Sequence, residues 1–376
     1  MEKTYTLTGA QDIAGKARRE ARAIVVTPVG LQGRGGIDRL NLYLNEYLSQ
    51  RGTAADIEFI GSRGEWPDPL WVFTFAGALV RFAWACLSGQ HDIAHIHVST
   101  NGSALRKVVF GKVARLFRMP YVIQFHGMMS EEIEHERKPW FRALGALARN
   151  AAGVIVLGEA YRGPFERMGV KPDLISIVHN GIPDIGKNVS IPRPRQDTVN
   201  IVFSGELAER KGAHLLLAAL AGMKDSPVLW RCTIAGNGEL EPLAKVARDY
   251  GIADRIDFTG WIDIARVHEL MRAADIVVLP SRAEALPLAL IEGASAGAAL
   301  VATDVGAVRD VAIDGVNGMV VERNAAAIEN ALRQLVEDSE LRQRMQQESR
   351  RIYCERFEIS KFAAAIRGAH EKYRRR

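Results

Sequence analysis

Apolar and polar positions follow one repeated order along this chain: an apolar run, a glycine-rich or polar turn, and a stretch of helical periodicity. Continuous apolar runs at 23–29, 121–125 and 154–157 are typical of strands buried on both faces of a parallel sheet. The same order starts again with the run 200–203. Strand, loop and helix signals repeated in both halves predict an α/β protein with two Rossmann-like domains.

Residues 183–198 interrupt this order, because they are rich in proline and polar groups and lack periodicity. They are the best position for a domain boundary. The expected organisation is a leader (1–22), an N-terminal domain (23–190), a linker (191–198), a C-terminal domain (199–355), and a last helix with a basic tail (356–376). The leader is polar and shows no secretory signal pattern.

Three segments of the first half each allow two interpretations. Residues 70–88 are nearly all apolar but contain Arg81, which predicts a buried or membrane-contacting helix rather than a spanning one. The strand 91–98 carries His95 and His97 on one face, either lining a cleft or binding a metal for which no third ligand is evident. Residues 103–118 form a basic amphipathic helix, suited to covering a sheet or to contacting anionic lipid.

Composition narrows the class of protein. The 376 residues are 48% apolar and 25% charged, which indicates ordinary globular domains. Three widely spaced cysteines form no disulfide framework or metal cluster, so a cytoplasmic location is expected. The net charge of +5 lies entirely in residues 1–190, with 23 Lys and Arg against 18 Asp and Glu. Such an excess suits an anionic partner, such as a membrane surface or a lipid diphosphate, and it is equally a common imbalance without a partner; no nucleic-acid partner is expected.

The most informative segment is 280–303, PSRAEALPLALIEGASAGAALVAT. It follows a strand-like run and predicts a helix over 286–296 with Pro287 in the first turn, where free N–H groups attract phosphate. Glu284 and Glu292 flank this helix start. Because two carboxylates repel a bare phosphate, they are expected to bind hydroxyls of the same ligand, as a sugar nucleotide provides. The alternative is a surface helix with two solvated glutamates.

This segment resembles the signature of retaining GT-B glycosyltransferases of the family 4 type (glycosyl transferases group 1), P-S-x-x-E-G-F-G-x-x-x-x-E-A-x-A-x-G-x-P-V-V-A-T. Glu284 and Glu292 match its two glutamates, whereas Ala285, Leu286 and Pro287 replace Gly-Phe-Gly. The resemblance implies that Glu284 binds hydroxyls of the donor sugar and Glu292 the ribose. It places Leu286, Pro287 and Leu288 at the donor site.

Further motifs extend the resemblance. In the family's G-R-L-x-x-x-K-G pattern Lys211 matches the diphosphate-binding lysine, but Glu206 stands at the arginine position, so Arg210 is the candidate for the missing charge. His126, after the strand 121–125, is expected beside the transferred sugar as a catalytic residue with Lys211 and Glu284. The remaining expected positions are Gly205, Gly236 and Trp261 for the donor, and Gly35, Gly36 and Arg34, with Arg39 nearby, for an acceptor and diphosphate loop.

The fold implied is GT-B, with the last helix crossing back to an acceptor-binding N-terminal domain and the C-terminal domain binding the nucleotide sugar. The implied function is transfer of a hexose, with retention, from GDP-mannose or a UDP-sugar to a lipid-linked saccharide in bacterial surface polysaccharide or exopolysaccharide synthesis. A polyprenyl diphosphate is the expected lipid carrier, and peripheral contact with the inner face of the cytoplasmic membrane is a further expectation. No Asp-x-Asp motif occurs, so no metal and no cofactor are expected.

Three alternatives remain. A GT-B sugar-nucleotide epimerase would need no acceptor. A non-catalytic GT-B scaffold subunit would account for Glu206 and the lost glycines. A nicotinamide-dependent oxidoreductase is disfavoured, because the G-x-G-x-x-G spacing is absent.

Overall fold

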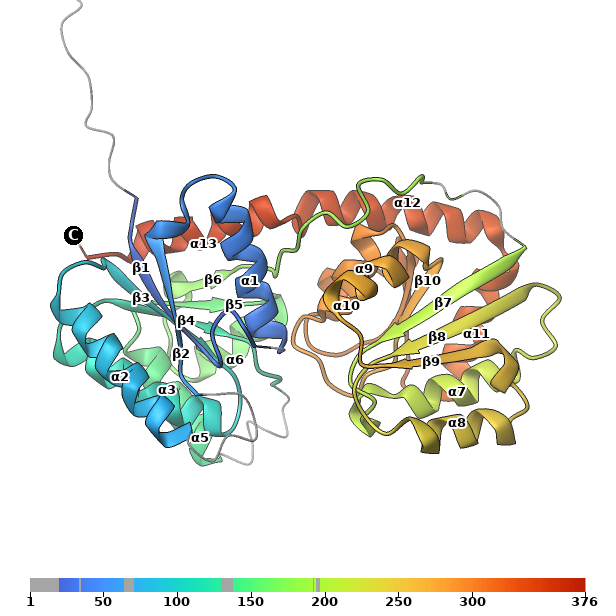
Figure 1. Ribbon diagram of the computed structural model, residues 1–376, viewed down its shortest axis with the longest axis horizontal. Helices are drawn as coiled ribbons and strands as arrows, with labels where there is room; N and C mark the ends of the chain where they lie inside the picture. Colours follow the sequence, from blue (N-terminus) through green and yellow to red (C-terminus); the bar gives the residue numbers. More distant parts are fainter. Residues whose placement is uncertain are drawn as a thin grey trace, which may run out of the picture.

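The computed structural model describes residues 20–33, 35–63, 71–129, 138–191, 193 and 197–375, and Figure 1 shows two α/β domains side by side. Residues 1–19 of the expected leader and Arg34 of the expected acceptor loop lie outside these ranges. Each domain contains a six-stranded sheet in which all strand pairs are parallel. The expectation of two Rossmann-like domains is confirmed.

The N-terminal sheet is built from apolar strands whose central members are completely buried. Its strands, in spatial order, are β2 (Ile57–Gly61), β1 (Ala23–Thr27), β3 (Ile93–Val98), β4 (Tyr121–Phe125), β5 (Gly153–Val156) and β6 (Ile175–Ile177). Its helices are α1 (Gly36–Ser49), α2 (Trp71–Leu87), α3 (Gly102–Leu116), α5 (Pro139–Arg149) and α6 (Arg162–Arg167). The strand order reverses beside β1, which pairs with both β2 and β3.

The C-terminal sheet has the order of a doubly wound dinucleotide-binding fold. Its strands, in spatial order, are β12 (Gly318–Val321), β11 (Ala299–Thr303), β10 (Ile276–Leu279), β7 (Thr198–Ser204), β8 (Leu229–Ala235) and β9 (Ile256–Gly260). Its helices are α7 (Ala213–Gly222), α8 (Leu240–Asp249), α9 (Ile264–Ala273), α10 (Leu288–Ser295) and α11 (Ala325–Glu337). The order reverses between β7 and β10, and such folds bind ligands outside the carboxyl ends of strands at that point.

Two stretches of chain connect the domains. α12 (Ser339–Arg356) packs on α10, and α13 (Ile359–Tyr373) returns to pack on α1, as Figure 1 shows along one edge of the molecule. The predicted crossing helix is therefore present. The chain that leaves the N-terminal domain already contacts the C-terminal domain at residue 185, because the Ile185 N–H donates to Ser295 Oγ at 3.2 Å. The crossing thus precedes the predicted linker at 191–198.

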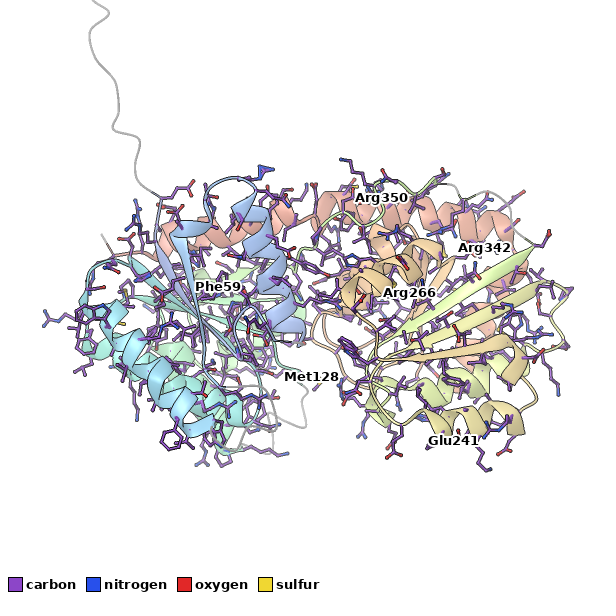
Figure 2. All side chains as sticks on the ribbon, viewed as in Figure 1. Phe59, Met128, Glu241, Arg266, Arg342 and Arg350 are labelled. Carbon is purple, nitrogen blue, oxygen red and sulfur yellow. The ribbon has the colours of Figure 1, made fainter. Side chains whose placement is uncertain are left out.

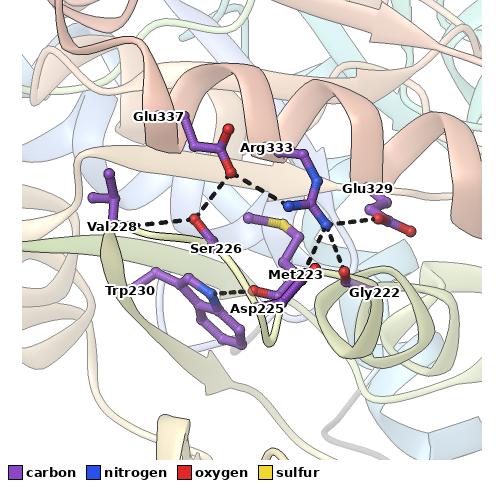
Figure 3. Close-up of polar contacts among 9 residues, drawn as sticks. All are labelled: Gly222, Met223, Asp225, Ser226, Val228, Trp230, Glu329, Arg333 and Glu337. Atoms are coloured by element: carbon purple, nitrogen blue, oxygen red, sulfur yellow. Dashed lines mark hydrogen bonds and ion pairs between the residues drawn. The ribbon is translucent and has the colours of Figure 1, made fainter.

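A polar network holds helix α11 in place within the C-terminal domain (Figure 3). The guanidinium of Arg333 on α11 donates to the carbonyl oxygen of Gly222 at 2.6 Å and to Oε1 of Glu329 at 3.1 Å. Glu337 on the same helix accepts from the Ser226 hydroxyl at 3.1 Å. These contacts hold α11 against the α7–β8 connection and serve the fold, because none of the three side chains lines the cleft between the domains.

Helix α2 is only partly buried. Phe75 and Phe82 pack edge-on against Phe110 of α3, with ring centroids 5.6 and 5.2 Å apart. The opposite face is open, with Phe73 74% and Trp84 67% exposed. Of the two expected readings, a buried or a membrane-contacting helix, full burial does not hold for this face of α2, and membrane contact stays a prediction. Within the described residues, no helix combines the length and apolar character needed to cross a membrane.

Candidate functional site

A cleft of about 720 Å³ lies between the domains, where the carboxyl ends of both sheets face each other. Met128, after β4, contributes to its wall and lies at the domain junction in Figure 2. The cleft is lined by every predicted site residue that the structure describes: Gly35, Gly36, His126, Gly205, Arg210, Lys211, Gly236, Trp261, Glu284, Leu286, Pro287, Leu288 and Glu292. The fold brings these residues into one cavity, because up to 257 positions separate them in the sequence.

Lys211 and Glu284 meet at the point where the C-terminal sheet reverses its order. Lys211 ends a 3₁₀ turn after β7, and Glu284 lies in the loop after β10. The Lys211 Nζ donates to Glu284 Oε1 at 2.6 Å, and the Ser281 hydroxyl donates to the same oxygen at 2.6 Å. The two side chains are 15% and 8% exposed, so the ion pair is largely shielded from water. A cation beside a carboxylate suits a ligand that carries both phosphate and hydroxyl groups.

The backbone at Glu284 is held from two sides. Gly306 has φ +58°, and a β-carbon there would lie 2.0 Å from the Glu284 carbonyl oxygen, so only glycine allows this approach. The Tyr161 hydroxyl of the N-terminal domain donates to the same oxygen at 3.1 Å. Glu284 is therefore fixed relative to both domains.

The start of α10 points an uncapped helix end at the cleft. Pro287 is its N-cap residue, no side chain caps it, and the helix begins at Leu288, two residues later than predicted. Leu288 also lies against the glycine loop of the other domain, because a β-carbon at Gly36 would be 3.9 Å from Leu288 Cδ1. Free N–H groups at a helix start attract phosphate, although the family's flexible Gly-Phe-Gly is missing here.

Glu292 forms an ion pair that the sequence did not indicate. Its Oε1 accepts from Arg39 of α1, in the other domain, and the two side chains are 1% and 20% exposed. Burial raises the pKa of Glu292, and Arg39 opposes that rise. Among the described residues, Oε2 of Glu292 has no hydrogen-bond partner. This oxygen is itself buried, although Glu292 as a residue lines the cleft. The signal for the ion pair was weak, since Arg39 merely follows the glycine loop by three positions.

The positive charge that was expected from Arg210 is neutralised by an ion pair with Glu206. Arg210 Nη2 donates to Glu206 Oε2 at 2.8 Å, and both side chains are more than one-third exposed. Glu206, which stands at the family's arginine position, therefore binds the arginine that was expected to compensate for it. Lys211 and the start of α10 are the remaining candidates for contact with a diphosphate.

Two glycines bring the ends of β7 and β8 into contact. A β-carbon at Gly236 would lie 1.6 Å from the Gly205 carbonyl oxygen, so no side chain fits there. Close backbone approach leaves room for a ligand beside the loops. Trp261, after β9, is 57% exposed although it is a large aromatic residue. An exposed indole at a cleft wall provides a surface on which a nucleotide base can stack.

His126 lies at the N-terminal wall, connected to a buried histidine. The His126 Nε2 and the His97 Nδ1 share one hydrogen bond of 2.7 Å. Burial lowers the pKa of His126 to about 3, so the imidazole is neutral at neutral pH. His95 and His97 are 1% and 2% exposed and do not line the cleft, so the reading that both face it is wrong. No group of metal-ligating side chains occurs in the part of the chain that the structure describes.

Sequence reasoning also missed the cleft residue Asn180. It is 4% exposed, and its side-chain amide donates to the Leu286 carbonyl oxygen at 3.3 Å across the domains. The Asn-Gly turn after β6 is a signal that could have found it. Tyr43 and His268 form a similar contact at 3.0 Å between α1 and α9, and no sequence pattern pairs those two positions.

Comparisons with known proteins agree with this geometry. A model described as glycosyl transferase 4-like domain matches residues 10–181, and one described as glycosyl transferases group 1 matches 185–352. The chain is 29% identical over 193 residues to a glycogen synthase of Mycobacterium tuberculosis, covering 51% of this chain and 47% of that relative. It therefore spans about half the length of that relative.

Two further comparisons cover most of the chain. A phosphatidyl-myo-inositol mannosyltransferase of Mycobacterium leprae is 28% identical over 318 residues, covering 80% of this chain and 77% of the relative. The crystal structure of Anabaena HepE in complex with UDP superposes with a TM-score of 0.72 at 19% identity, covering 92% of this chain and 98% of that one. The structural match shows the same fold.

Proposed function

Because the chain belongs to the group 1 glycosyltransferases of the GT-B fold, we propose that it transfers a sugar from a nucleotide-diphosphate sugar to a saccharide acceptor. The observation that carries this proposal is the Lys211–Glu284 pair, at the switch point of the C-terminal sheet, in the same cleft as His126. A shielded cation and a carboxylate at this position match the two chemical parts of such a donor.

In the proposed reaction the bond between the anomeric carbon and the β-phosphate oxygen breaks. The acceptor oxygen forms a bond to that carbon, and the acceptor proton passes to the departing diphosphate. Lys211 and the N–H groups at the start of α10 stabilise the negative charge that develops on the diphosphate. Glu284 accepts hydrogen bonds from hydroxyls of the sugar, and the Glu292 carboxylate, at the wall of the cleft, accepts one from a ribose hydroxyl.

We propose retention of the anomeric configuration through attack on the face from which the diphosphate departs. Neutral His126 lies beside the sugar and contributes a hydrogen bond without a charge. Its ring nitrogen Nδ1 is a donor when His97 donates to Nε2, and an acceptor in the reverse case. Neither a metal nor a cofactor is part of this proposal.

The proposed donor is GDP-mannose or a UDP-sugar, and Trp261 stacks on the base. The complex of HepE with UDP supports a UDP-sugar, and the mannosyltransferase among the relatives supports a mannose donor. The proposed acceptor is a lipid-linked saccharide of bacterial surface polysaccharide or exopolysaccharide synthesis. The open apolar face of α2 and the basic residues of α3 support peripheral contact with the inner face of the cytoplasmic membrane.

One observation favours a second candidate function. Glu206 occupies the family's arginine position and binds Arg210, so the diphosphate site has one cation fewer than the family pattern. A non-catalytic scaffold subunit would tolerate that loss, whereas a transferase must obtain the charge from Lys211 and α10.

The proposal is tested by calorimetric and thermal-shift binding against UDP, GDP, ADP, CMP and their common sugars. Lys211→Ala and Glu292→Ala should each weaken binding of the one nucleotide that the wild-type protein selects. Lys245→Ala is the matched control, because Lys245 forms an exposed ion pair with Asp249 on α8 and should leave binding unchanged. Binding of no nucleotide by the folded protein would favour the scaffold, and donor turnover without acceptor would favour an epimerase.

A further inference from the structure

Four histidines form a row inside the N-terminal domain, from the crossing helix to the cleft. His370 lies on α13, His95 and His97 lie on β3, and His126 follows β4. The first three are 2% exposed or less, and of the four only His126 lines the cleft. This histidine row therefore reaches the proposed reaction site from the interior of the protein.

Each histidine of the row contacts the next one. The His370 Nε2 and the His95 Nδ1 share a hydrogen bond of 3.0 Å. His95 and His97 lie on the same face of β3, and their rings stack with centroids 4.6 Å apart and an interplanar angle of 13°. The His97 Nδ1 and the His126 Nε2 share the hydrogen bond of 2.7 Å. The His97 ring is therefore held from two sides, by the stacked ring of His95 and by its bond to His126.

The histidine row is uncharged at neutral pH. Burial lowers the pKa of His126 to about 3 and that of His370 to about 4. Burial also lowers the pKa of His95 and of His97, and the neighbouring histidines lower both further. A neutral imidazole has one N–H donor and one acceptor nitrogen, so one ring of a bonded pair donates and the other accepts. The direction of the His97–His126 bond therefore decides whether Nδ1 of His126 is an acceptor or a donor.

The backbone of His126 is bonded to the same strand as its ring. The His126 N–H donates to the Val98 carbonyl oxygen at 2.8 Å, at the end of β3. Val98 directly follows His97, so two adjacent residues of β3 bond the backbone and the ring nitrogen Nε2 of His126. The ring of His126 cannot turn without breaking its bond to His97.

We infer that His97 is a positioning residue for His126, and that its Nδ1 holds the His126 ring in one orientation and one tautomer. His97 is 2% exposed and does not line the cleft, so it acts through His126 and not on a ligand. A fixed tautomer offers a sugar in the cleft one kind of hydrogen bond at Nδ1 instead of a mixture of two. The effect on transfer rests on the proposed function, whereas the fixed ring of His126 does not.

The competing role for His97 is to fill space in the core. In that case an apolar side chain of similar size would replace it without any effect on His126. The position of the polar atom separates the two roles. Asparagine places its amide where Nδ1 lies, glutamine places it one bond further from Cβ, and both amides can donate or accept. A positioning role requires that His97→Asn preserves the state of His126 and that His97→Gln does not.

The first test is NMR of the full chain, labelled with ¹⁵N at histidine and measured near pH 7 without ligand. Long-range ¹H–¹⁵N spectra show which ring nitrogen carries the proton, and His126→Asn identifies the signals of His126. We expect one tautomer of His126 in the wild-type protein and in His97→Asn, and a mixture of both in His97→Leu and His97→Gln. His91→Leu is the matched control and should leave the His126 signals unchanged, because His91 is a buried histidine of the same domain that pairs with Glu58 at 3.2 Å, outside the row.

Two NMR results would overturn the inference. One is a mixture of His126 tautomers in the wild-type protein, and the other is a His126 tautomer that is the same in His97→Leu as in the wild type. Urea unfolding shows whether each variant is folded. If His97→Leu does not fold, the comparison of His97→Asn with His97→Gln decides, because the same His126 tautomer in both would overturn the inference.

Steady-state kinetics with the donor selected by the nucleotide panel tests the effect on transfer. His97→Leu should lower kcat about 10- to 100-fold and change the donor KM less than about threefold, because the reacting groups are misplaced while the donor site is intact. His97→Asn should restore most of kcat. A wild-type kcat in His97→Leu would overturn the effect on transfer. Absence of transfer in the wild-type protein would refute the proposed function, and the NMR result would still decide whether His97 positions His126.

Discussion

The Arg39–Glu292 ion pair joins the two domains, and its removal has a pH-dependent cost that the structure lets us calculate. Arg39→Met keeps the aliphatic length of the side chain and removes the charge. Glu292 is 1% exposed and then lacks its cation, whereas Glu292→Gln leaves Arg39 with access to water at 20% exposure. The arginine substitution is therefore the more damaging of the two.

The loss of unfolding free energy has an upper limit, because an unpaired buried carboxylate can take up a proton instead of remaining charged. Protonating Glu292 at pH 7, relative to an unfolded chain with the ordinary pKa of 4.5, requires about 2.5 pKa units, or about 3.4 kcal/mol. At about pH 5.5 the same limit is about 1.4 kcal/mol. A native pKa above the unfolded value means that the folded state binds more protons, so the stability of Arg39→Met must fall as the pH rises above about 4.5.

The assay is urea unfolding followed by tryptophan fluorescence at several pH values. Arg39→Met should lose up to about 3.4 kcal/mol of unfolding free energy near pH 7 and clearly less near pH 5.5. Arg39→Met/Glu292→Gln should recover most of the loss and its pH dependence. Arg266→Met, which breaks an exposed pair with Glu269, should cost about 1 kcal/mol or less at every pH. A loss in Arg39→Met that does not change between these pH values would refute the reasoning.

Three further predictions follow from the cleft. Lys211→Met should lower kcat about 10²- to 10³-fold, since it removes the shielded cation at the diphosphate; an unchanged kcat in steady-state assays would show that another group carries this charge. Gly236→Ala should destabilise the protein by about 1 to 3 kcal/mol and weaken nucleotide binding, because its methyl group meets the Gly205 carbonyl oxygen; wild-type stability in urea unfolding would contradict the close approach. His126 has its pKa lowered by burial to about 3, so the pH–rate profile should show no titration of His126 between about pH 5 and pH 8; an inflection near pH 6.5 that disappears in His126→Asn would contradict this.

The local order of elements could be predicted from the sequence because it depends on neighbours in the chain. Apolar runs such as 121–125 became completely buried parallel strands, and the last helix, predicted within 356–376, spans Ile359–Tyr373. The turn residues after each strand also marked which positions meet at the carboxyl edge of a parallel sheet. Ligands of such folds bind at the carboxyl ends of the parallel strands, so Glu284 and His126, which follow strands, could be predicted to lie at the site, and both line the cleft.

Contacts between side chains of different domains could not be predicted, because no periodicity relates positions that are far apart in the chain. Arg39 was expected only to add charge beside the glycine loop, and the domain arrangement placed it on Glu292. The hydrogen bond between Tyr43 and His268 likewise depends on how α1 and α9 of the two domains meet.

The sequence by itself determined the two-domain α/β architecture and the residue types of the site, since both follow from local hydrophobic patterning and from motif spacing. Only the tertiary structure decided which charges are neutralised. Glu206 binds Arg210, Glu284 binds Lys211, and Glu292 binds Arg39. Electrostatic interactions depend on distance and burial in three dimensions, and neither quantity is encoded in the order of residues along the chain.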